Sequence, residues 1–243
     1  MNDPTVRFNA ALHHLGVIMD GNGRWAQQRG LPRSAGHQAG VQALKRLVSF
    51  AGEYNIRIIT AFAFSTENWH RPSSEVNFLM RLLAETIAKE IDELAEKGVH
   101  LRFIGRLHEL PKDLIRTLDG AMARTAANDQ LVLNVALNYG GRAEIVDAVR
   151  KIADLVQRGQ LALDDIGEEL VARQMTTEGL PDPDLIIRTG GEHRLSNFLL
   201  WQSAYAELWV TSTYWPDFDR RELVRALMAY QVRKRRFGRI HEI

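Results

Sequence analysis

The chain carries the sequence LGVIMDGNGRW at residues 15–25. Its first five residues are apolar and predict a buried strand. Asp20 therefore follows the end of a strand, and two glycines beside it let backbone N–H groups approach a ligand closely. Arg24 and Trp25 then begin a predicted helix. Because ligands of open α/β sheets bind beyond the carboxyl ends of the strands, this unit predicts a binding site at its turn.

Two interpretations of this turn compete. An Asp beside a glycine-rich cradle of N–H groups suits a diphosphate bound together with Mg²⁺. Asp-Gly and Asn-Gly pairs are also common in turns that hold no ligand. A dinucleotide site is excluded, because the third glycine and the distal acidic residue of that fingerprint are missing.

Short apolar runs alternate with longer helical patterns along the chain. The predicted strands are residues 15–19, 56–64, 99–104, 131–137, 185–187 and 208–211. The predicted helices are residues 38–54, 75–97, 113–127, 142–158 and 220–236. Such alternation predicts an α/β fold with a mostly parallel central sheet of about six strands flanked by helices. Neither an internal repeat nor a linker interrupts the pattern, so residues 1–243 are expected to form a single domain.

Composition excludes several classes of protein. The formal net charge of the 243 residues is +1, from 31 Lys and Arg against 30 Asp and Glu, so no overall charge attracts nucleic acid. Cysteine is absent, which excludes disulfides and thiolate catalysis and suits a reducing compartment. The N-terminus lacks a signal-peptide pattern, and no apolar run reaches the ~18 residues that could cross a bilayer. We expect a cytoplasmic protein without a nucleic-acid partner.

Polar residues cluster just beyond the ends of three predicted strands. In a parallel sheet, five arginines from these segments would face one another across a crevice: Arg24, Arg33, Arg71, Arg188 and Arg194. The planar guanidinium group suits two-point contact with phosphate oxygens. A surface ion pair is the simpler explanation for any one of these arginines. The five together predict a ligand with several phosphate charges, such as two phosphorylated molecules.

Five segments resemble the motifs of the cis-prenyltransferase family, in the family's order and over nearly the whole chain. They are HLGVIMDGNGRWA at 14–26, RSAGH at 33–37, AFSTENWHRP at 63–72, NYGGR at 138–142 and PDLIIRTGGEHRLSNFLLWQ at 183–202. Glu207 and the sequence WPDF at 215–218 follow in the same order. Motifs of this length in register are specific to the family.

The resemblance implies an enzyme that condenses isopentenyl diphosphate repeatedly onto an allylic diphosphate and forms cis double bonds. It implies Mg²⁺ as the cofactor and a homodimer as the assembly. The expected primer is farnesyl diphosphate. The expected product is a long-chain polyprenyl diphosphate, such as the undecaprenyl carrier precursor used in cell-wall biogenesis.

The resemblance also implies roles for individual residues. Asp20 would engage Mg²⁺ and the departing diphosphate, with Glu207 as a second Mg²⁺ ligand. The cradle of the allylic diphosphate would comprise Gly21, Asn22, Gly23, Arg24, Arg33 and His37. Arg188, Arg194 and Ser196 would anchor isopentenyl diphosphate. The other expected substrate contacts are Trp25, Ser65, Thr66, Glu67, Asn68, Trp69, Arg71 and Leu195.

One implied role conflicts with elementary chemistry. The family credits the position of Asn68 with accepting a proton, but a carboxamide is a very poor base. We therefore expect Asn68 to orient a substrate, a water or a diphosphate oxygen that takes the proton.

An apolar product needs a dry channel, and the resemblance implies an apolar tunnel. The candidate lining residues, between the sheet and the helix predicted at 75–97, are Val41, Ala63, Phe78, Leu79, Leu82, Leu83 and Leu131. Small Ala63 would leave passage, whereas Leu131 would form a floor.

Several alternatives remain open or are disfavoured. Asp164, Asp165 and Glu168 resemble the Asp-rich motif of trans-prenyl synthases, but those enzymes are all-helical, so a helix N-cap is the preferred interpretation. The basic tail at 233–239 is either a solvated helix end or a weak contact with anionic membrane lipid. A non-catalytic binding subunit and a nucleotide-dependent phosphotransferase are the rival functions. No Walker A motif supports the second of these rivals.

Overall fold

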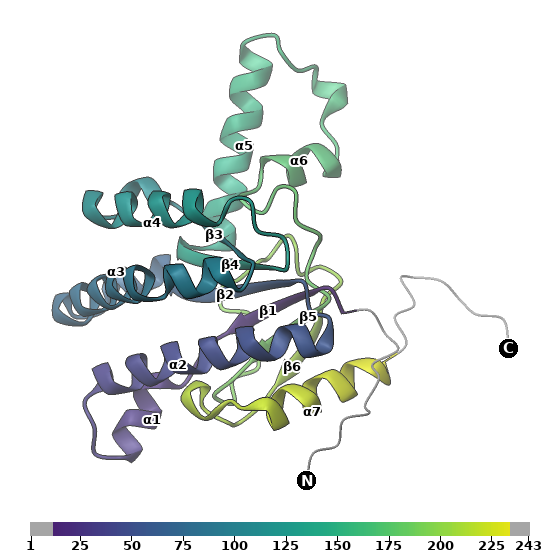
Figure 1. Ribbon diagram of the computed structural model, residues 1–243. Helices are drawn as coiled ribbons and strands as arrows, with labels where there is room; N and C mark the ends of the chain where they lie inside the picture. Colours follow the sequence, from purple (N-terminus) through teal and green to yellow (C-terminus); the bar gives the residue numbers. More distant parts are fainter. Residues whose placement is uncertain (1–11, 234–243) are drawn as a thin grey trace, which may run out of the picture.

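A six-stranded parallel sheet forms the centre of the protein, whose residues 12–233 are described in a computed structural model (Figure 1). The strands are β1 (His14–Ile18), β2 (Ile58–Ser65), β3 (Val99–Ile104), β4 (Leu131–Tyr139), β5 (Leu185–Arg188) and β6 (Glu207–Val210). Their order across the sheet is β3-β4-β2-β1-β5-β6, and every neighbouring pair is parallel. The predicted α/β fold and its six strands are confirmed.

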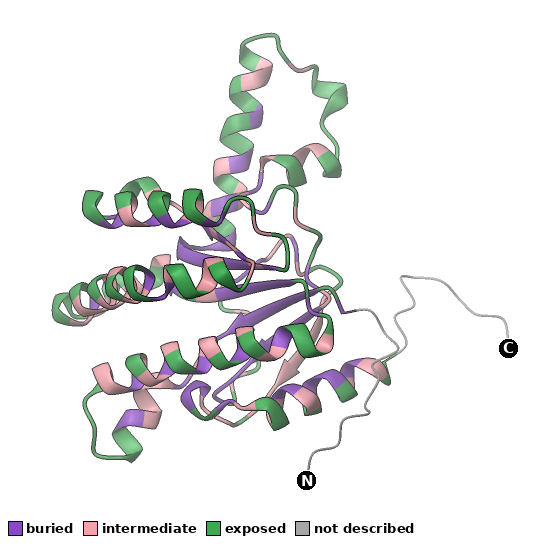
Figure 2. Ribbon diagram, in the orientation of Figure 1, coloured by how far each residue is buried: buried purple, intermediate pink, exposed green. Residues whose placement is uncertain are grey.

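Helices flank the sheet, and most of those that pack on it cover the same face. They are α1 (Asn22–Gln28), α2 (Arg33–Ala51), α3 (Ser73–Glu96), α4 (Lys112–Thr125), α5 (Gly141–Gln157), α6 (Glu168–Gln174) and α7 (Arg220–Gln231). Figure 1 shows α2, α3 and α4 side by side over one face, while α5 and α6 project from the molecule. The strands are mostly buried, apart from the half-buried edge strand β6, and the helices expose their outer sides (Figure 2).

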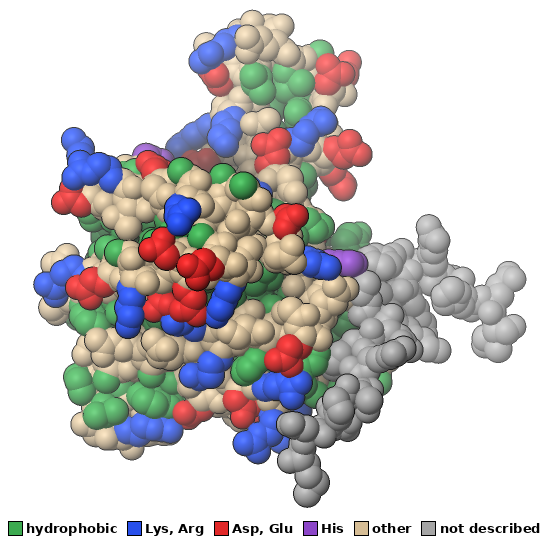
Figure 3. Space-filling model, in the orientation of Figure 1, with side chains coloured by type: hydrophobic (Ala, Val, Ile, Leu, Met, Phe, Trp, Pro, Cys, Tyr) green, Lys and Arg blue, Asp and Glu red, His purple; other side chains and the backbone are tan. Residues whose placement is uncertain are grey.

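The core has two parts, one on each face of the sheet. The larger part packs alternate side chains of the strands, such as Val17 and Ile59, against α2, α3, α4 and α7. The smaller part lies on the opposite face, where Phe198 and Leu199 pack against Ile18 and Ile186. Successive side chains of a strand therefore point alternately into the two parts of the core, as expected for a sheet covered on both faces. Charges of both signs are interspersed on the face seen in Figure 3, consistent with the near-zero net charge.

β2 contains an irregularity that matters for the site. Its register against β4 shifts between Phe62 and Phe64, so that Ala63 is left out of the pairing. Ala63 is exposed, whereas Phe64 after it is buried and Phe62 before it is half-buried. Bulges of this kind re-aim a side chain near functional sites. Here the bulge turns Ala63 toward the carboxyl edge of the sheet, where the cleft described below opens.

Two expectations about helices need correction. The helix predicted at 38–54 begins at Arg33, so that Arg33 and His37 lie on the first turns of α2. Asp164 and Asp165 lie in a short 3₁₀ turn, and Gly167 is the N-cap of α6, without a side-chain cap. The N-cap interpretation of the Asp pair was therefore wrong. Most of the basic tail, from residue 234 onward, lies outside the described residues.

Candidate active site

The segments that follow β1, β2 and β5 meet in one cleft at the carboxyl edge of the sheet, as the parallel topology predicts. The cleft has a volume of about 550 Å³. Nine of the expected site residues line it: Asp20, Asn22, His37, Ser65, Glu67, Asn68, Arg71, Arg188 and Ser196. Its other lining residues are Ile18, Met19, Phe62, Ala63, Leu79 and Asn197.

Asp20 and two arginines form the first charged group of the cleft. Arg188 Nη2 donates to Asp20 Oδ2 at 2.9 Å, and Arg24 Nη2 lies 3.1 Å from Asp20 Oδ1. The Asp20 side chain is 30% exposed, whereas that of Arg188 is only 4% exposed. Arg24 is also fixed by donation to the carbonyl oxygen of Gly190. A single carboxylate is thus held between two guanidinium groups, of which Arg188 also lines the cleft where an anion would enter.

Arg188 is the most deeply held cation of the cleft. Its Nη1 donates to Ser196 Oγ at 2.7 Å and to the carbonyl oxygen of Arg194 at 2.5 Å. Its Nε is buried and has no hydrogen-bond partner among the described residues. A buried charged donor without a partner is costly unless a ligand supplies one. An oxygen of a bound anion would satisfy this donor.

Glu75 gathers a second group of cations on the other side of the cleft. Its carboxylate accepts from Arg33 at 3.1 and 3.2 Å and from Arg71 at 3.1 Å. His37 Nε2 lies 3.4 Å from Glu75 Oε1 but makes no hydrogen bond to it. Burial alone would raise the pKa of Glu75, but the hydrogen bond and charge of Arg33 and the charge of Arg71 hold it below 4.5. Burial, with the nearby arginines, lowers the pKa of His37, so this ring is neutral at pH 7.

The turn after β2 brings several polar groups to the cleft. Ser65 caps this turn, and its backbone N–H donates to Asn68 Oδ1 at 3.2 Å. The carboxamide oxygen of Asn68 is therefore engaged, which leaves its NH₂ group as the donor available to a ligand. Asn197 Nδ2 donates to Glu67 Oε1 at 2.8 Å. Burial would raise the pKa of Glu67, but this and nearby hydrogen bonds outweigh burial and lower it.

The two glycines after Asp20 allow close packing. Gly21 has a φ of 103°, and a Cβ there would lie 2.5 Å from Cδ1 of Tyr214. A Cβ on Gly23 would lie 2.5 Å from Nη1 of Arg33. These positions therefore admit the Arg33 guanidinium and the tight turn into α1, while the glycines themselves do not line the cleft.

Several expected contacts point away from the cleft. Trp25 Nε1 donates to Asp217 Oδ1 at 2.7 Å, and Trp69 Nε1 donates to Asn138 Oδ1 at 2.7 Å. Thr66 lies against Gly140, and Leu195 packs against the smaller core. Arg194 is 60% exposed and pairs with Glu192 at 2.7 Å. None of these five residues lines the cleft.

Glu207 is not brought to Asp20 within the chain. It begins β6 and is in register with Leu185, three residues before Arg188, so it lies roughly 10 Å back along the strand direction. Its carboxylate pairs with Arg233. The expectation that Glu207 and Asp20 share one Mg²⁺ ion is not met by the geometry of a single chain.

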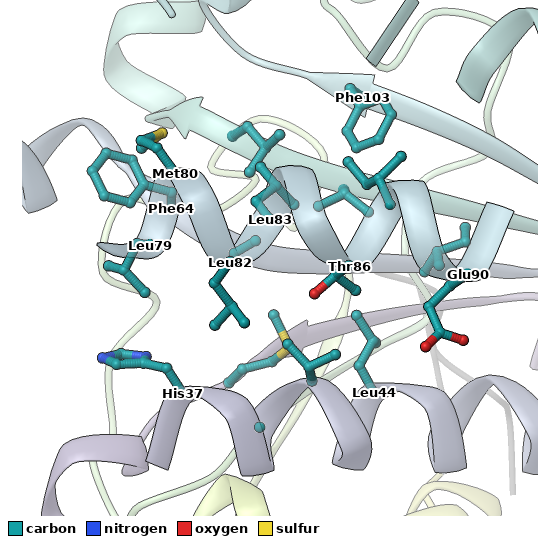
Figure 4. Close-up of a pocket in the computed structure, with 18 of the residues that line it drawn as sticks. His37, Leu44, Phe64, Leu79, Met80, Leu82, Leu83, Thr86, Glu90 and Phe103 are labelled. Atoms are coloured by element: carbon teal, nitrogen blue, oxygen red, sulfur yellow. The ribbon is translucent and has the colours of Figure 1, made fainter. Parts of the chain in front are cut away.

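An apolar cavity continues from the cleft. It has a volume of about 170 Å³ and lies between the sheet and the helices α2 and α3. Five residues line both spaces and form the neck between them: Met19, Asn22, His37, Ala63 and Leu79. Figure 4 shows His37 at one end of the cavity and Glu90 at the other, with leucines of α2 and α3 between them. Of the candidate tunnel residues, Phe78 and Leu131 do not line this cavity.

Among residues 12–233, no three His, Cys, Asp or Glu side chains gather into a metal site. Mg²⁺ often takes only one or two carboxylates and completes its shell with substrate phosphates and water. Asp20, half-exposed beside a cleft lined by arginine, fits that kind of site. In the same part of the chain, no helix is long and apolar enough to cross a membrane.

Sequence reasoning missed two residues of the site. Glu75 lies in the first turn of α3, where an acidic residue is ordinary because the helix dipole favours it. Its neighbours Arg33, Arg71 and His37 become visible only in the fold. Asn197 has a φ of 65° and follows Ser196, whose φ is 49°. Asn adopts this left-handed conformation more readily than most residues. The Ser-Asn pair after the glycine-rich turn is therefore the sequence signal that could have indicated Asn197 as a site residue.

Comparisons with known proteins agree with this architecture. A family model described as "Putative undecaprenyl diphosphate synthase" matches residues 18–238. An isoprenyl transferase of Heliobacterium mobile is 56% identical over 225 residues, covering 93% of this chain and 86% of that protein. A protein of Legionella pneumophila named ditrans,polycis-undecaprenyl-diphosphate synthase, specific for (2E,6E)-farnesyl diphosphate, is 49% identical over 229 residues, covering 94% and 96%.

A solved structure is also similar over the whole fold. The crystal structure of lavandulyl diphosphate synthase from Lavandula x intermedia, in complex with dimethylallyl diphosphate, superposes with a TM-score of 0.91 at 38% identity. The match covers 94% of this chain and 98% of that one. Together with the family match over residues 18–238, these similarities show that the chain belongs to the undecaprenyl diphosphate synthase family of cis-prenyltransferases.

Proposed function

We propose that this protein condenses isopentenyl diphosphate repeatedly onto farnesyl diphosphate, with cis double bonds, to give undecaprenyl diphosphate. The observation that carries the proposal is the joining of two spaces. An arginine-lined cleft for diphosphates opens through a neck into an apolar cavity for the hydrocarbon chain. The product named for the Legionella pneumophila relative supports the choice of primer and chain length.

Charge stabilisation explains most of the expected chemistry. In each cycle the C1–O bond of the allylic diphosphate breaks, C1 bonds to C4 of isopentenyl diphosphate, and a proton leaves C2. Negative charge develops on the departing diphosphate, where preorganised cations stabilise the transition state. Arg33 and Arg71, held by Glu75, would bind that diphosphate, while Arg188 and Ser196 would hold isopentenyl diphosphate.

Asp20 is the proposed protein ligand of Mg²⁺. When bound, the ion would neutralise charge on the diphosphate oxygens and so weaken the bond to C1. Asp20 belongs to the first charged group of the cleft and is held by Arg24 and Arg188 in the present geometry. These arginines would turn toward phosphate oxygens as Asp20 turns toward the ion.

Asn68 is proposed to position rather than to accept a proton. Its oxygen already accepts from Ser65, and its NH₂ group is left to donate to a diphosphate oxygen or a water. That oxygen, and not the carboxamide, would take the proton from isopentenyl diphosphate. The cations that hold the two substrates side by side also offset the repulsion between these two anions.

The assembly and location are proposals as well. Val146 and Val149 of α5 are 46% and 55% exposed, which makes this helix the candidate surface for a homodimer. Sedimentation of the protein at several concentrations would test it. Peripheral contact with membrane lipid through the basic tail stays a prediction, since most of that tail lies outside the described residues.

The proposed activity is tested with farnesyl diphosphate, radiolabelled isopentenyl diphosphate and Mg²⁺. We expect butanol-extractable label that disappears with EDTA and in Asp20→Ala. Transfer of phosphate from radiolabelled ATP, tested in a separate reaction, would instead indicate a phosphotransferase. A folded protein that incorporates no label would indicate a binding subunit and refute the proposal.

A further inference from the structure

Asn197 joins three segments of the chain that meet beside the cleft. It follows Ser196 in the segment after β5 and lines the cleft itself. Its Nδ2 donates to Glu67 Oε1 at 2.8 Å, in the turn after β2. Its carbonyl oxygen accepts from the N–H of Gly141 at 2.7 Å, and its Oδ1 accepts from the N–H of Arg142 at 2.8 Å. The turn after β2, the start of α5 and the segment after β5 are therefore connected through one asparagine.

The start of α5 has no cap of its own. Gly140 is the N-cap residue and carries no side chain, although Ser, Thr, Asp or Asn at this position would cap the helix. The backbone of Gly140 is extended, so its conformation does not require glycine. A lack of space does require it, because a Cβ would lie 2.6 Å from Nδ2 of Asn197 and 2.7 Å from Oγ1 of Thr66. Asn197 thus takes the place of the missing cap and closes over the glycine.

The backbone of Asn197 is suited to this position. Its φ is 65°, in the left-handed region that Asn and Asp adopt more readily than most residues. One residue earlier, the hydroxyl of Ser196 accepts from Nη1 of Arg188 at 2.7 Å. The pair proposed to hold isopentenyl diphosphate is therefore followed directly by the residue that ties this segment to its neighbours.

The turn after β2 belongs to the side of the other substrate. In this turn Glu67 directly precedes Asn68 of the cleft. Arg71 follows the turn and belongs to the group of cations around Glu75. The hydrogen bond from Asn197 to Glu67 thus links the segment proposed to hold the allylic diphosphate with the segment proposed to hold isopentenyl diphosphate. Glu67 is exposed and Asn197 is half-buried, so water competes for this bond and its contribution to stability is small.

We propose that Asn197 is a positioning residue that fixes the two diphosphate sites relative to each other. The inference rests on the proposed prenyl-elongating function. Asn197 acts through Glu67, Ser196 and the start of α5, and it takes no part in bond formation. Its replacement should change the rate of condensation more than the affinity for either substrate, because misplacement of reacting atoms by 1 Å can cost about a hundredfold in rate.

The experiment exchanges the donor and the acceptor of the hydrogen bond between Asn197 and Glu67. Asn197→Asp keeps the shape, the backbone preference and the acceptor for Arg142, but it turns a second carboxylate toward Glu67. A negative charge beside the start of α5 is favourable for the helix dipole, so this variant should fold. Glu67→Gln supplies an NH₂ group that can donate to the new carboxylate. The double variant therefore has the same hydrogen bond reversed and the same net charge as wild type.

Asn128→Asp is the matched control for the chemical change alone. Asn128 is half-buried and donates to the carbonyl oxygens of Ala95 and Val99, at the amino edge of the sheet and away from the cleft. The same substitution there should leave kcat within about twofold of wild type.

We expect kcat with farnesyl diphosphate and isopentenyl diphosphate to fall by about tenfold to a hundredfold in Asn197→Asp. The KM for each substrate should stay within about threefold of the wild-type value. Made in the Glu67→Gln background, the same substitution should lower kcat by less than about threefold. An unchanged kcat in Asn197→Asp, an equal loss in both backgrounds, or a raised KM with unchanged kcat would overturn the proposal.

Hydrogen exchange tests the connection without any need for elongation. Amide exchange of the whole protein is followed by mass spectrometry in peptides that cover residues 62–72 and 192–198. These peptides should exchange faster in Asn197→Asp than in wild type, recover in the double variant and stay unchanged in Asn128→Asp. Unchanged exchange in Asn197→Asp would refute the connection. Faster exchange in a protein that elongates no prenyl chain would support the connection and refute the proposed function alone.

Discussion

Replacement of Asp20 by Asn removes the carboxylate while keeping its shape. The wild-type carboxylate faces Arg188 at 2.9 Å on one oxygen and Arg24 at 3.1 Å on the other. The amide oxygen of Asn can still accept from one arginine, but its NH₂ group faces the second. Two guanidinium groups then lose their shared counter-charge.

The structure sets the size of the effect on stability. Removing one partner of a fully buried ion pair costs about 3–5 kcal/mol, because the remaining charge stays buried. Arg188 is buried, but Asp20 is 30% and Arg24 41% exposed, so water screens part of the loss. We therefore expect the free energy of unfolding to fall by about 2 kcal/mol in the absence of ligand.

The effect on activity should be larger. Loss of the metal ligand removes several kcal/mol of transition-state stabilisation, which corresponds to a fall in kcat of about a thousandfold or more. Binding of inorganic diphosphate separates this role from a structural one. In wild type, Mg²⁺ should strengthen diphosphate binding. In Asp20→Asn, diphosphate should bind at least as tightly without Mg²⁺, since no carboxylate competes for the arginines, and Mg²⁺ should add little.

Urea denaturation and titration calorimetry with and without Mg²⁺ provide the two measurements. Gln27→Glu, an exposed change on α1, is a suitable control for handling and folding. If Asp20→Asn retained the full gain in diphosphate affinity on adding Mg²⁺, the assignment of Asp20 as the metal ligand would be refuted. An unchanged free energy of unfolding would refute the account of the Asp20–arginine group.

Three further predictions concern the neck, the Glu75 group and the pH dependence of stability. Ala63→Leu should narrow the neck and shorten the products, and Leu131→Ala should lengthen them by opening space beyond Leu133; equal chain lengths in all three proteins would contradict this. Glu75→Gln should lower the free energy of unfolding by about 1–2 kcal/mol and raise KM for the allylic substrate, because Arg33 and Arg71 lose their common acceptor. Urea denaturation and steady-state kinetics measure these two effects. A changed kcat with wild-type KM would argue against a positioning role for Glu75. Burial lowers the pKa of His14 and His37 below 6.5, so both rings take up a proton on unfolding. The free energy of unfolding should therefore be insensitive to their titration above pH 6.5 and fall as the pH drops below it, by up to about 1.4 kcal/mol per pH unit for each ring. Denaturation curves between pH 5 and 8 would show a shallower dependence in His14→Gln, and an unchanged slope would contradict the account.

The sheet could be predicted because each strand carries its own local signal. Apolar runs such as Leu15–Ile18 are bounded by polar turns, and parallel topology follows from the intervening helices. The convergence of Arg71 and Arg188 with Asp20 then followed from topology alone, because carboxyl ends of parallel strands share one edge.

The rest of the site depended on contacts that no local pattern contains. Glu207 lies beside a strand, but it begins β6 and therefore stands at the opposite edge from Asp20. Trp25 and Trp69 find hydrogen-bond partners outside the cleft, which is common for half-buried indoles and has no signal in the sequence. Glu75 was invisible because its three partners come from α2 and from the turn before α3.

The most direct test of the central claim is the identity of the product made from farnesyl diphosphate and isopentenyl diphosphate with Mg²⁺. The product is dephosphorylated and compared with cis and trans polyprenol standards by reversed-phase chromatography. The account predicts a long polyprenol whose added units are all cis. A product with trans units, or no elongation by folded protein, would contradict it.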